Sequence, residues 1–354
     1  MTVIANPEQI TPRWLNEALQ QAGYRGEVTD FSWQSIGAGQ VGDNARLDLQ
    51  GSGDIPASLV AKFPSADPVS KQTGVALNNY AREVFFYRDL APTVDIQTPR
   101  VFATEFDPAS HDFIILMEDL APGIQVAQMD GCSAERAELA IVELAKLHGP
   151  RWDDATLREH ALLNPEVSAA AEDSDEPGPP LYTMFQDGFL QRYQARLDDA
   201  QQQMVRDIGQ VQDSYADYQG PQTLIHIDYR LDNMIFGGPY PLAILDWQSI
   251  NLGCALVDVA YFLGTSLLPE TRREFEQALL ATYLETLRGY DVQLDEETCW
   301  QLYRHYAPAG LNMAVIASMI VGETERGNDM FMAMAERSII MCQDLQTVDL
   351  LANG

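Results

Sequence analysis

The sequence predicts an α+β protein in which a small antiparallel β-sheet precedes a larger, mainly helical part. Residues 31–49 read as a strand, a glycine-rich turn and a second strand, and residues 45–49 alternate between apolar and polar side chains. Short apolar runs at 58–63, 101–103 and 113–117 predict further strands. After residue 120 the apolar residues recur at helical spacing instead. We therefore expect one domain at 1–120 and a second at 121–354.

Length, composition and charge restrict the class of protein. The chain has 354 residues, of which 46% are hydrophobic, and this suits one large or two medium domains with ample core. No apolar run reaches membrane-spanning length, and the N-terminus does not resemble a signal peptide, so we expect a cytoplasmic protein that binds no membrane. The four cysteines lie far apart and predict reduced, packed thiols. The net charge of −30 disfavours nucleic-acid binding; it is compatible with a cationic substrate, although solubility alone explains it.

Helix-start residues mark two of the predicted helices. Thr11 and Pro12 are preferred at a helix start and Gly23 at a helix end, so a short helix is expected between them. Ser133 is the predicted N-cap of a helix that reaches His148. Residues 155–180 are acidic and rich in Pro and Gly, which predicts a mobile surface loop, and residues 181–218 are predicted to form a long helical stretch.

The stretch from Leu224 to Ile250 combines short apolar runs with oxygen-bearing side chains. It reads LIHIDYRLDNMIFGGPYPLAILDWQSI, and its two adjacent glycines predict a turn that folds the flanking segments back together. Asp228, Asn233 and Asp246 each lie beside one of the apolar runs. Phosphoryl transfer needs an acceptor for a hydroxyl proton and hard oxygen ligands for Mg²⁺, and this spacing supplies both. A single Asp or Asn is common in turns, and His226 alone would indicate only a structural histidine. The occurrence of His, Asp, Asn and Asp in this order, each beside an apolar run, instead predicts a phosphotransferase site.

The segments HIDYRLDN and ILDWQ resemble the small-molecule kinases of the protein-kinase-like superfamily: aminoglycoside phosphotransferases, choline kinases and the ecdysteroid-kinase-like group. The resemblance covers residues 30–265 and implies a two-lobe fold that uses ATP and Mg²⁺. It implies that Asp228 accepts the hydroxyl proton, that His226 and Arg230 belong to the catalytic set, and that Asn233 and Asp246 hold the metal.

Two positions depart from related patterns. Ile227 stands where the family usually has Gly, which is expected to alter the geometry of the loop. Asp246-Trp247-Gln248 stands where protein kinases have Asp-Phe-Gly, and this argues against a protein kinase. Asp258 follows Asp246 after only twelve residues, which leaves no room for an activation segment, and it is expected to brace the catalytic loop.

The N-terminal part contains the features that the resemblance implies for nucleotide binding. Gly37, Gly39 and Gly42 would let backbone N–H groups approach phosphate oxygens, although any hairpin can be rich in glycine. Lys62 matches the kinase lysine that contacts the α- and β-phosphates, and Glu83 on a predicted helix at 78–87 matches its partner; the alternative is an exposed strand lysine. Because a buried ammonium needs a counter-charge, we predict that Lys62 Nζ lies within salt-bridge reach of Glu83, or approaches it when nucleotide binds.

The segment from Met117 to Gly123 resembles the hinge between kinase lobes. Backbone groups near Glu118 and Leu120 would read the adenine edge, and this assignment depends on position alone.

The leading interpretation is an ATP-dependent kinase that phosphorylates a hydroxyl of a small molecule, with an ecdysteroid-like compound or another alcohol as the acceptor. One alternative is an aminoglycoside or macrolide antibiotic kinase, and another is a catalytically silent, pseudokinase-like binding protein. The silent binding protein is disfavoured because four residues that the chemistry needs are present: Lys62, Asp228, Asn233 and Asp246.

Overall fold

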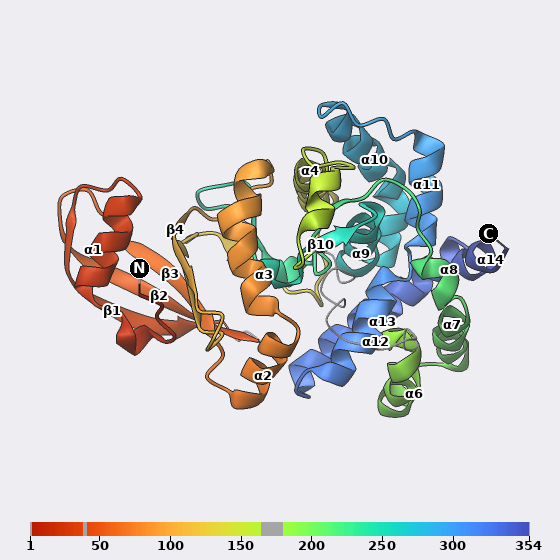
Figure 1. Cartoon of the computed structure of the whole chain (residues 1–354). Helices are drawn as coiled ribbons and strands as arrows, with labels where there is room; N and C mark the ends of the chain where they lie inside the picture. The colour runs from red at the N-terminus through yellow and green to blue at the C-terminus, as the bar shows by residue number, and fades with distance from the viewer. Residues whose placement is uncertain (1, 38–40, 164–179, 354) are drawn as a thin grey trace. The chain divides into compact units, whose positions relative to one another are not determined.

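The computed structural model describes residues 2–37, 41–163 and 180–353 (Figure 1). Gly39 and most of the predicted surface loop at 155–180 lie outside the described residues. The chain divides into two compact units. The first contains Met1–Thr93, Gln97–Gly123 and Gly237–Ser249, and the second contains Val94–Ile96, Ile124–Phe236 and Ile250–Gly354.

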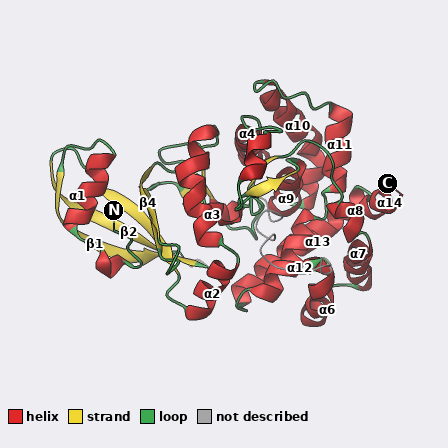
Figure 2. Cartoon of the chain, in the orientation of Figure 1, coloured by secondary structure: helices red, strands yellow, loops and turns green. Residues whose placement is uncertain are grey.

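The predicted α+β class is confirmed. Strands dominate the first unit and helices dominate the second (Figure 2). The boundary at residue 120 stays a prediction. Because Gly237–Ser249 belongs to the first unit, Asp246 is grouped with residues that precede it in the chain by more than a hundred positions.

The first unit contains a five-stranded antiparallel sheet with the strand order β1-β2-β3-β5-β4. Its strands are β1 (Glu27–Ile36), β2 (Gly42–Ser52), β3 (Ser58–Pro64), β4 (Val101–Phe106) and β5 (Phe113–Glu118). Helix α1 (Pro12–Gln21) buries Leu15, Ala18 and Leu19 in the same core as Leu47 and Leu59 of the sheet. Thr11 caps this helix through the backbone N–H of Trp14, as its sequence predicts.

Two helices and one further strand complete the first unit. Helix α2 (Pro68–Ala76) is followed by α3 (Asn79–Phe85), which continues into a wider π-helical turn at Phe86–Leu90. Strand β9 (Leu242–Ile244) leads directly to Asp246. The predicted helix at 78–87 is therefore confirmed, and its N-cap residue, Asn78, has a left-handed conformation with φ 55°.

The second unit is built of helices around short strand pairs. Its helices are α4 (Ala134–His148), α6 (Leu181–Tyr193), α7 (Asp199–Gln210), α8 (Gln212–Ala216), α9 (Leu256–Ser266), α10 (Pro269–Arg288), α11 (Glu296–His305), α12 (Ala309–Ile320), α13 (Glu325–Asp344) and α14 (Thr347–Asn353). Strands β6 (Ile124–Gln125) and β8 (Met234–Phe236) pair with each other, as do β7 (Thr223–Ile225) and β10 (Asn251–Gly253). In the described part of the chain, none of the helices combines the length and the apolarity that a membrane crossing requires.

The long helical stretch predicted at 181–218 is broken into α6, α7 and α8. Helix α7 begins at a capping box, in which Asp198 accepts from the backbone N–H of Gln201 and the Gln201 side chain accepts from the backbone N–H of Asp198. This arrangement fixes a helix start, so the apolar periodicity on either side did not mean one continuous helix. Ser133 caps α4, as predicted.

Candidate active site

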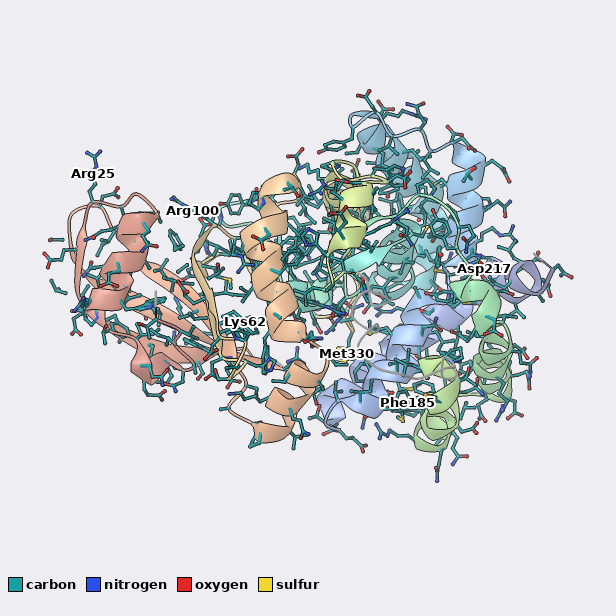
Figure 3. The ribbon with its side chains drawn as sticks, viewed as in Figure 1. Arg25, Lys62, Arg100, Phe185, Asp217 and Met330 are labelled. Atoms are coloured by element: carbon teal, nitrogen blue, oxygen red, sulfur yellow. The ribbon has the colours of Figure 1, made fainter. Side chains whose placement is uncertain are left out.

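Lys62, which is labelled in Figure 3, is buried on β3. It forms the centre of a charged cluster in the first unit. Its Nζ lies 2.6 Å from Glu83 Oε2 and 2.8 Å from Asp246 Oδ1. The predicted contact with Glu83 is confirmed. The contact with Asp246 was not predicted, because sequence analysis assigned that carboxylate to the metal alone. We call these three residues the Lys62 cluster.

A ring stack secures the segment that carries Asp246. Trp247 is fully buried, and its ring stacks on Phe86 at a centroid distance of 3.6 Å and an interplanar angle of 5°. Phe86 directly continues the helix of Glu83, so both carboxylates of the Lys62 cluster are held by one buried aromatic contact. Sequence analysis noticed Trp247 only as a departure from Asp-Phe-Gly and did not find its structural partner.

The charges of the Lys62 cluster do not balance, because two carboxylates share one ammonium. Burial disfavours the charged lysine, but Asp246 and Glu83 outweigh this effect and hold the pKa of Lys62 above its ordinary value. Burial, reinforced by the charge of Asp246, raises the pKa of Glu83 to about 7 despite the nearby ammonium. Lys62 therefore stays charged near neutral pH, whereas Glu83 takes up a proton more readily than an ordinary glutamate does.

The glycine-rich turn can be assessed at two of its three predicted residues. Gly37 has φ +70°, a conformation that side-chain-bearing residues rarely adopt. A Cβ added to Gly42 would lie 3.0 Å from the carbonyl oxygen of Phe63 and 3.3 Å from Lys62 Cε. The bare backbone of Gly42 is therefore what allows β2 to run so close to the Lys62 side chain.

The predicted hinge residues make specific contacts within the first unit. Glu118 Oε2 accepts a hydrogen bond of 2.9 Å from the hydroxyl of Tyr240, and the Glu118 backbone N–H donates to the Arg100 carbonyl. The Leu120 carbonyl accepts from Gly123, and a Cβ at Gly238 would approach that carbonyl oxygen to 2.5 Å. The N–H of Glu118 is thus already used, so any contact with adenine would fall to the other backbone groups of this segment.

In the second unit, Asp228 lies in a loop from His226 to Asn233 that we call the catalytic loop. Its Oδ1 accepts hydrogen bonds of 2.8 Å from Tyr261 Oη and 2.8 Å from Arg230 Nε, and its Oδ2 accepts one of 2.9 Å from Asn233 Nδ2. The structure thus brings together three of the predicted residues, Asp228, Arg230 and Asn233. Sequence analysis missed Tyr261. The available signal was its place on α9, three residues after Asp258 and therefore on the same helix face.

Asp258 braces the start of the catalytic loop, as predicted. It is fully buried and accepts hydrogen bonds from the backbone N–H groups of His226 at 2.6 Å and Ile227 at 2.8 Å. His148 Nε2 lies 3.4 Å from Asp258 Oδ2, the same oxygen that accepts the His226 N–H. Ile227 has φ +70°, an uncommon conformation for a β-branched residue, so the loop keeps a turn that a glycine would adopt without strain.

His226 and Arg230 have very different surroundings. The His226 side chain is fully buried and packs edge-on against the Tyr229 ring at 5.7 Å, so its imidazole belongs to the core. Arg230 Nη1 lies 2.6 Å from Asp232 Oδ2 and 2.9 Å from Met330 Sδ on α13, while its Nε contacts Asp228. Burial opposes its charge, but Asp228 and the other nearby acidic groups hold the pKa of Arg230 above its ordinary value.

The predicted metal ligands offer oxygen atoms of the kind that Mg²⁺ prefers. Asn233 donates its amide nitrogen to Asp228, which leaves the amide oxygen as its ligand atom, and Asp246 supplies a carboxylate that is 28% exposed. Across the described residues there is no group of three or more His, Cys, Asp and Glu that could hold a metal by itself. Each side chain by itself offers an oxygen of the kind that Mg²⁺ accepts, since Mg²⁺ is commonly bound through one or two protein oxygens together with phosphates and water.

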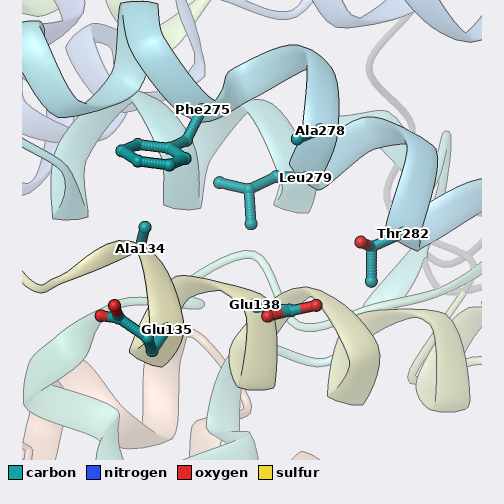
Figure 4. Close-up of a pocket in the computed structure, with 7 residues that line it drawn as sticks. All are labelled: Ala134, Glu135, Glu138, Phe275, Ala278, Leu279 and Thr282. Atoms are coloured by element: carbon teal, nitrogen blue, oxygen red, sulfur yellow. The ribbon is translucent and has the colours of Figure 1, made fainter.

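A hollow of about 230 Å³ lies elsewhere in the second unit, between α4 and α10 (Figure 4). Phe275 and Leu279 of α10 point toward α4, which carries Glu135 and Glu138 (Figure 4). None of the predicted site residues lines this hollow, so we do not include it in the candidate site.

The chain belongs to the phosphotransferase enzyme family known as APH, because residues 32–292 match the model of that family. Its fold is similar to that of a Plasmodium vivax ethanolamine kinase, with 13% identity, a TM-score of 0.50, and coverage of 94% of this chain and 84% of that one. It is also similar to APH(2″)-IIa in its gentamicin complex, with 16% identity, a TM-score of 0.52, and coverage of 96% and 99%. No curated protein matches the chain. The predicted resemblance is confirmed, and the chain is a phosphotransferase-family protein with a kinase-like fold.

Proposed function

We propose that this protein is an ATP-dependent O-phosphotransferase that phosphorylates a hydroxyl group of a small molecule in the cytoplasm. The observation that carries the proposal is the arrangement of Asp228. Its carboxylate is oriented by three side-chain donors and is 19% exposed, in a loop whose backbone is braced by buried Asp258. A carboxylate held in this way suits a base that must meet a substrate hydroxyl in one orientation.

The reaction needs little covalent work from the protein. The acceptor oxygen attacks the γ-phosphorus of ATP, the bond from that phosphorus to the β–γ bridging oxygen breaks, and ADP leaves. Asp228 takes the proton that the hydroxyl loses. Arg230 holds Asp228 at Oδ1, while His226, whose ring is buried, acts by positioning the loop rather than by touching the substrate.

Nucleotide binding is assigned to the first unit. Lys62 directs its ammonium at the α- and β-phosphates, and Glu83 holds it in place. Gly37, Gly39 and Gly42 let the backbone approach the phosphates, and the segment at Glu118 and Leu120 meets the adenine. When Mg²⁺ is bound, it neutralises phosphate charge, and Asn233 and Asp246 are the residues that would hold it.

The acceptor is assigned only as an alcohol, with an ecdysteroid-like compound among the candidates. An aminoglycoside or macrolide kinase is the second candidate function. The observation that favours it is the net charge of −30, which suits a cationic acceptor, together with the fold shared with a gentamicin-binding enzyme. A silent binding protein is disfavoured because the Lys62 cluster and Asp228 are both assembled.

An ATP-consumption screen over aminoglycosides, macrolides, choline, ethanolamine, sterols and simple alcohols tests the proposal. We expect at least one alcohol to accelerate ADP release and to yield a phosphorylated product by mass spectrometry. If ATP binds but none of these compounds is phosphorylated, the binding-protein alternative replaces the kinase.

Lys62→Ala tests the nucleotide assignment. We expect it to raise the KM for ATP and to lower kcat, each by about tenfold, because both charge and positioning are lost. Lys71→Ala is the matched control, since Lys71 lies on α2 of the same unit and forms a more exposed ion pair with Asp112 at 2.6 Å. If the two substitutions changed KM and kcat equally, Lys62 would not belong to the nucleotide site.

A further inference from the structure

We infer that Tyr261 is a positioning residue which, together with Arg230, occupies Oδ1 of Asp228 and thereby makes Oδ2 the oxygen that receives the acceptor proton. This inference rests on the proposed function and adds a residue to it. Tyr261 lies on α9, outside the catalytic loop, and its hydroxyl donates to Asp228 Oδ1 at 2.8 Å.

The hydrogen bonds of Asp228 are unequal between its two oxygens. A carboxylate oxygen has two lone pairs, and at Oδ1 both are engaged, one by Tyr261 and one by Arg230. Oδ2 receives only Asn233 Nδ2 among these side-chain donors, at 2.9 Å. A hydroxyl that approaches Asp228 therefore finds an acceptor site at Oδ2 and none at Oδ1.

Tyr261 is well suited to hold this arrangement. Its side chain is 1% exposed, so it is fixed by packing. Burial and the charge of Asp228 hold the pKa of Tyr261 well above its ordinary value, so the phenol keeps its proton and remains a donor. A flexible or ionisable donor would let the carboxylate rotate and exchange the roles of its two oxygens.

The alternative is that Tyr261 has a purely structural role, as a core tyrosine whose hydroxyl forms one buried hydrogen bond. Tyr303 provides the matched comparison, because it is also fully buried in the second unit and donates to a carboxylate, Glu276 Oε2, at 2.9 Å. Removal of either hydroxyl costs the protein one buried hydrogen bond to a charged group. Only Tyr261→Phe removes a hydrogen bond from the carboxylate of the proposed base, and it leaves one position at Oδ1 open beside Arg230.

The experiment compares Tyr261→Phe, Tyr303→Phe and Asp228→Asn with MgATP, with water as the acceptor and with any alcohol that the screen identifies. ADP release gives the rate, calorimetry gives the ATP affinity, and urea unfolding gives the stability. We expect Tyr261→Phe to slow ADP release by about tenfold or more, as the loss of a hydrogen bond to a charged group predicts, with ATP affinity unchanged within about twofold. Tyr303→Phe should change stability but neither the rate nor the affinity.

Equal rates for Tyr261→Phe and Tyr303→Phe, or a parallel loss of rate and ATP affinity in Tyr261→Phe, overturn the inference. Full activity of Asp228→Asn instead overturns the proposed function, so the two failures are distinguishable. If Tyr261→Phe does not fold, a crystal structure of the unmodified protein decides the question. An Asp228 Oδ1 turned away from the Tyr261 hydroxyl rejects the positioning role, and a contact within about 3 Å supports it.

Discussion

The Lys62 cluster and the catalytic loop both hold a charged side chain in a fixed position, but they stabilise it in different ways. Lys62 is surrounded by two carboxylates, and the group as a whole carries an excess negative charge. Asp228 is held by one cation and two neutral donors, Tyr261 and Asn233, in a loop whose backbone is fixed by Asp258. The first arrangement is therefore sensitive to pH through Glu83, whereas the second depends on geometry. Substitutions in each region should reveal this difference.

The largest effect is expected in the catalytic loop. Asp228→Asn should lower turnover about 10²–10⁴-fold, as the loss of a general base commonly does. ATP affinity should be largely unchanged, because nucleotide binding is assigned to the first unit. Steady-state kinetics with the acceptor and calorimetry with ATP measure the two quantities. Turnover within threefold of the unmodified protein would exclude Asp228 as the base.

The second prediction concerns the brace of the same loop. Asp258→Ala leaves the buried N–H of His226 and the half-buried N–H of Ile227 without their acceptor, at a cost of about 1–3 kcal/mol each. We expect urea denaturation to show a loss of about 2–5 kcal/mol in the free energy of unfolding. Asp295→Ala is the control, because Asp295 accepts the Thr298 N–H at an exposed helix start, where the loss should be about 1 kcal/mol. Similar losses of unfolding free energy in the two variants would mean that the burial of Asp258 contributes little to stability.

The third prediction concerns the charge excess of the Lys62 cluster. The pKa of Glu83 is about 7 in the folded protein against an ordinary 4.5, so its proton favours the folded state. That contribution is fully present below pH 4.5 and is lost as the pH rises through 7. Glutamine cannot titrate, so Glu83→Gln should become more stable relative to the unmodified protein across this range, by roughly 1.4 kcal/mol for each unit of the pKa difference.

Unfolding free energies of both proteins, measured from pH 4.5 to pH 8, check this expectation. A stability difference that is independent of pH would mean that Glu83 stays ionised and that Lys62 compensates its charge completely. The same substitution should weaken ATP use, and less than Lys62→Ala does, because the amide still orients the lysine without balancing its charge. Stability and activity would then respond to Glu83 in opposite directions.

The smallest effect is expected at Ile227, whose φ of +70° costs about 1–2 kcal/mol for a residue with a side chain. Glycine removes this strain but gains freedom in the unfolded chain, so Ile227→Gly should stabilise the protein by at most about 1 kcal/mol. Ile235→Gly is the control, because Ile235 is also half-buried but lies in strand β8. It should only destabilise. If Ile227→Gly lost as much unfolding free energy as Ile235→Gly, packing of the Ile227 side chain would outweigh the backbone strain.

Much of the fold could be predicted from the sequence because the signals are local. Caps such as Thr11 and Ser133 act on backbone groups two or three residues away, and strand alternation is set by neighbouring residues. The same holds for Asp228 and Asn233, which are five positions apart and share one loop. Where a local signal was overlooked, as in the capping box of Asp198, the helix boundary was predicted wrongly.

The sequence alone determined which residues are candidates for the chemistry and their order along the chain, since side-chain type and spacing are written in it. The Lys62–Glu83 pair could still be predicted from it, but only the tertiary structure decided the other partners. Lys62 and Asp246 are 184 positions apart, and Tyr261 reaches Asp228 from another helix. It also decided that the His226 ring is buried and that Phe86 stacks on Trp247. Such contacts depend on how the whole chain folds back on itself, and no periodicity or local preference encodes the distance between residues so far apart in the sequence.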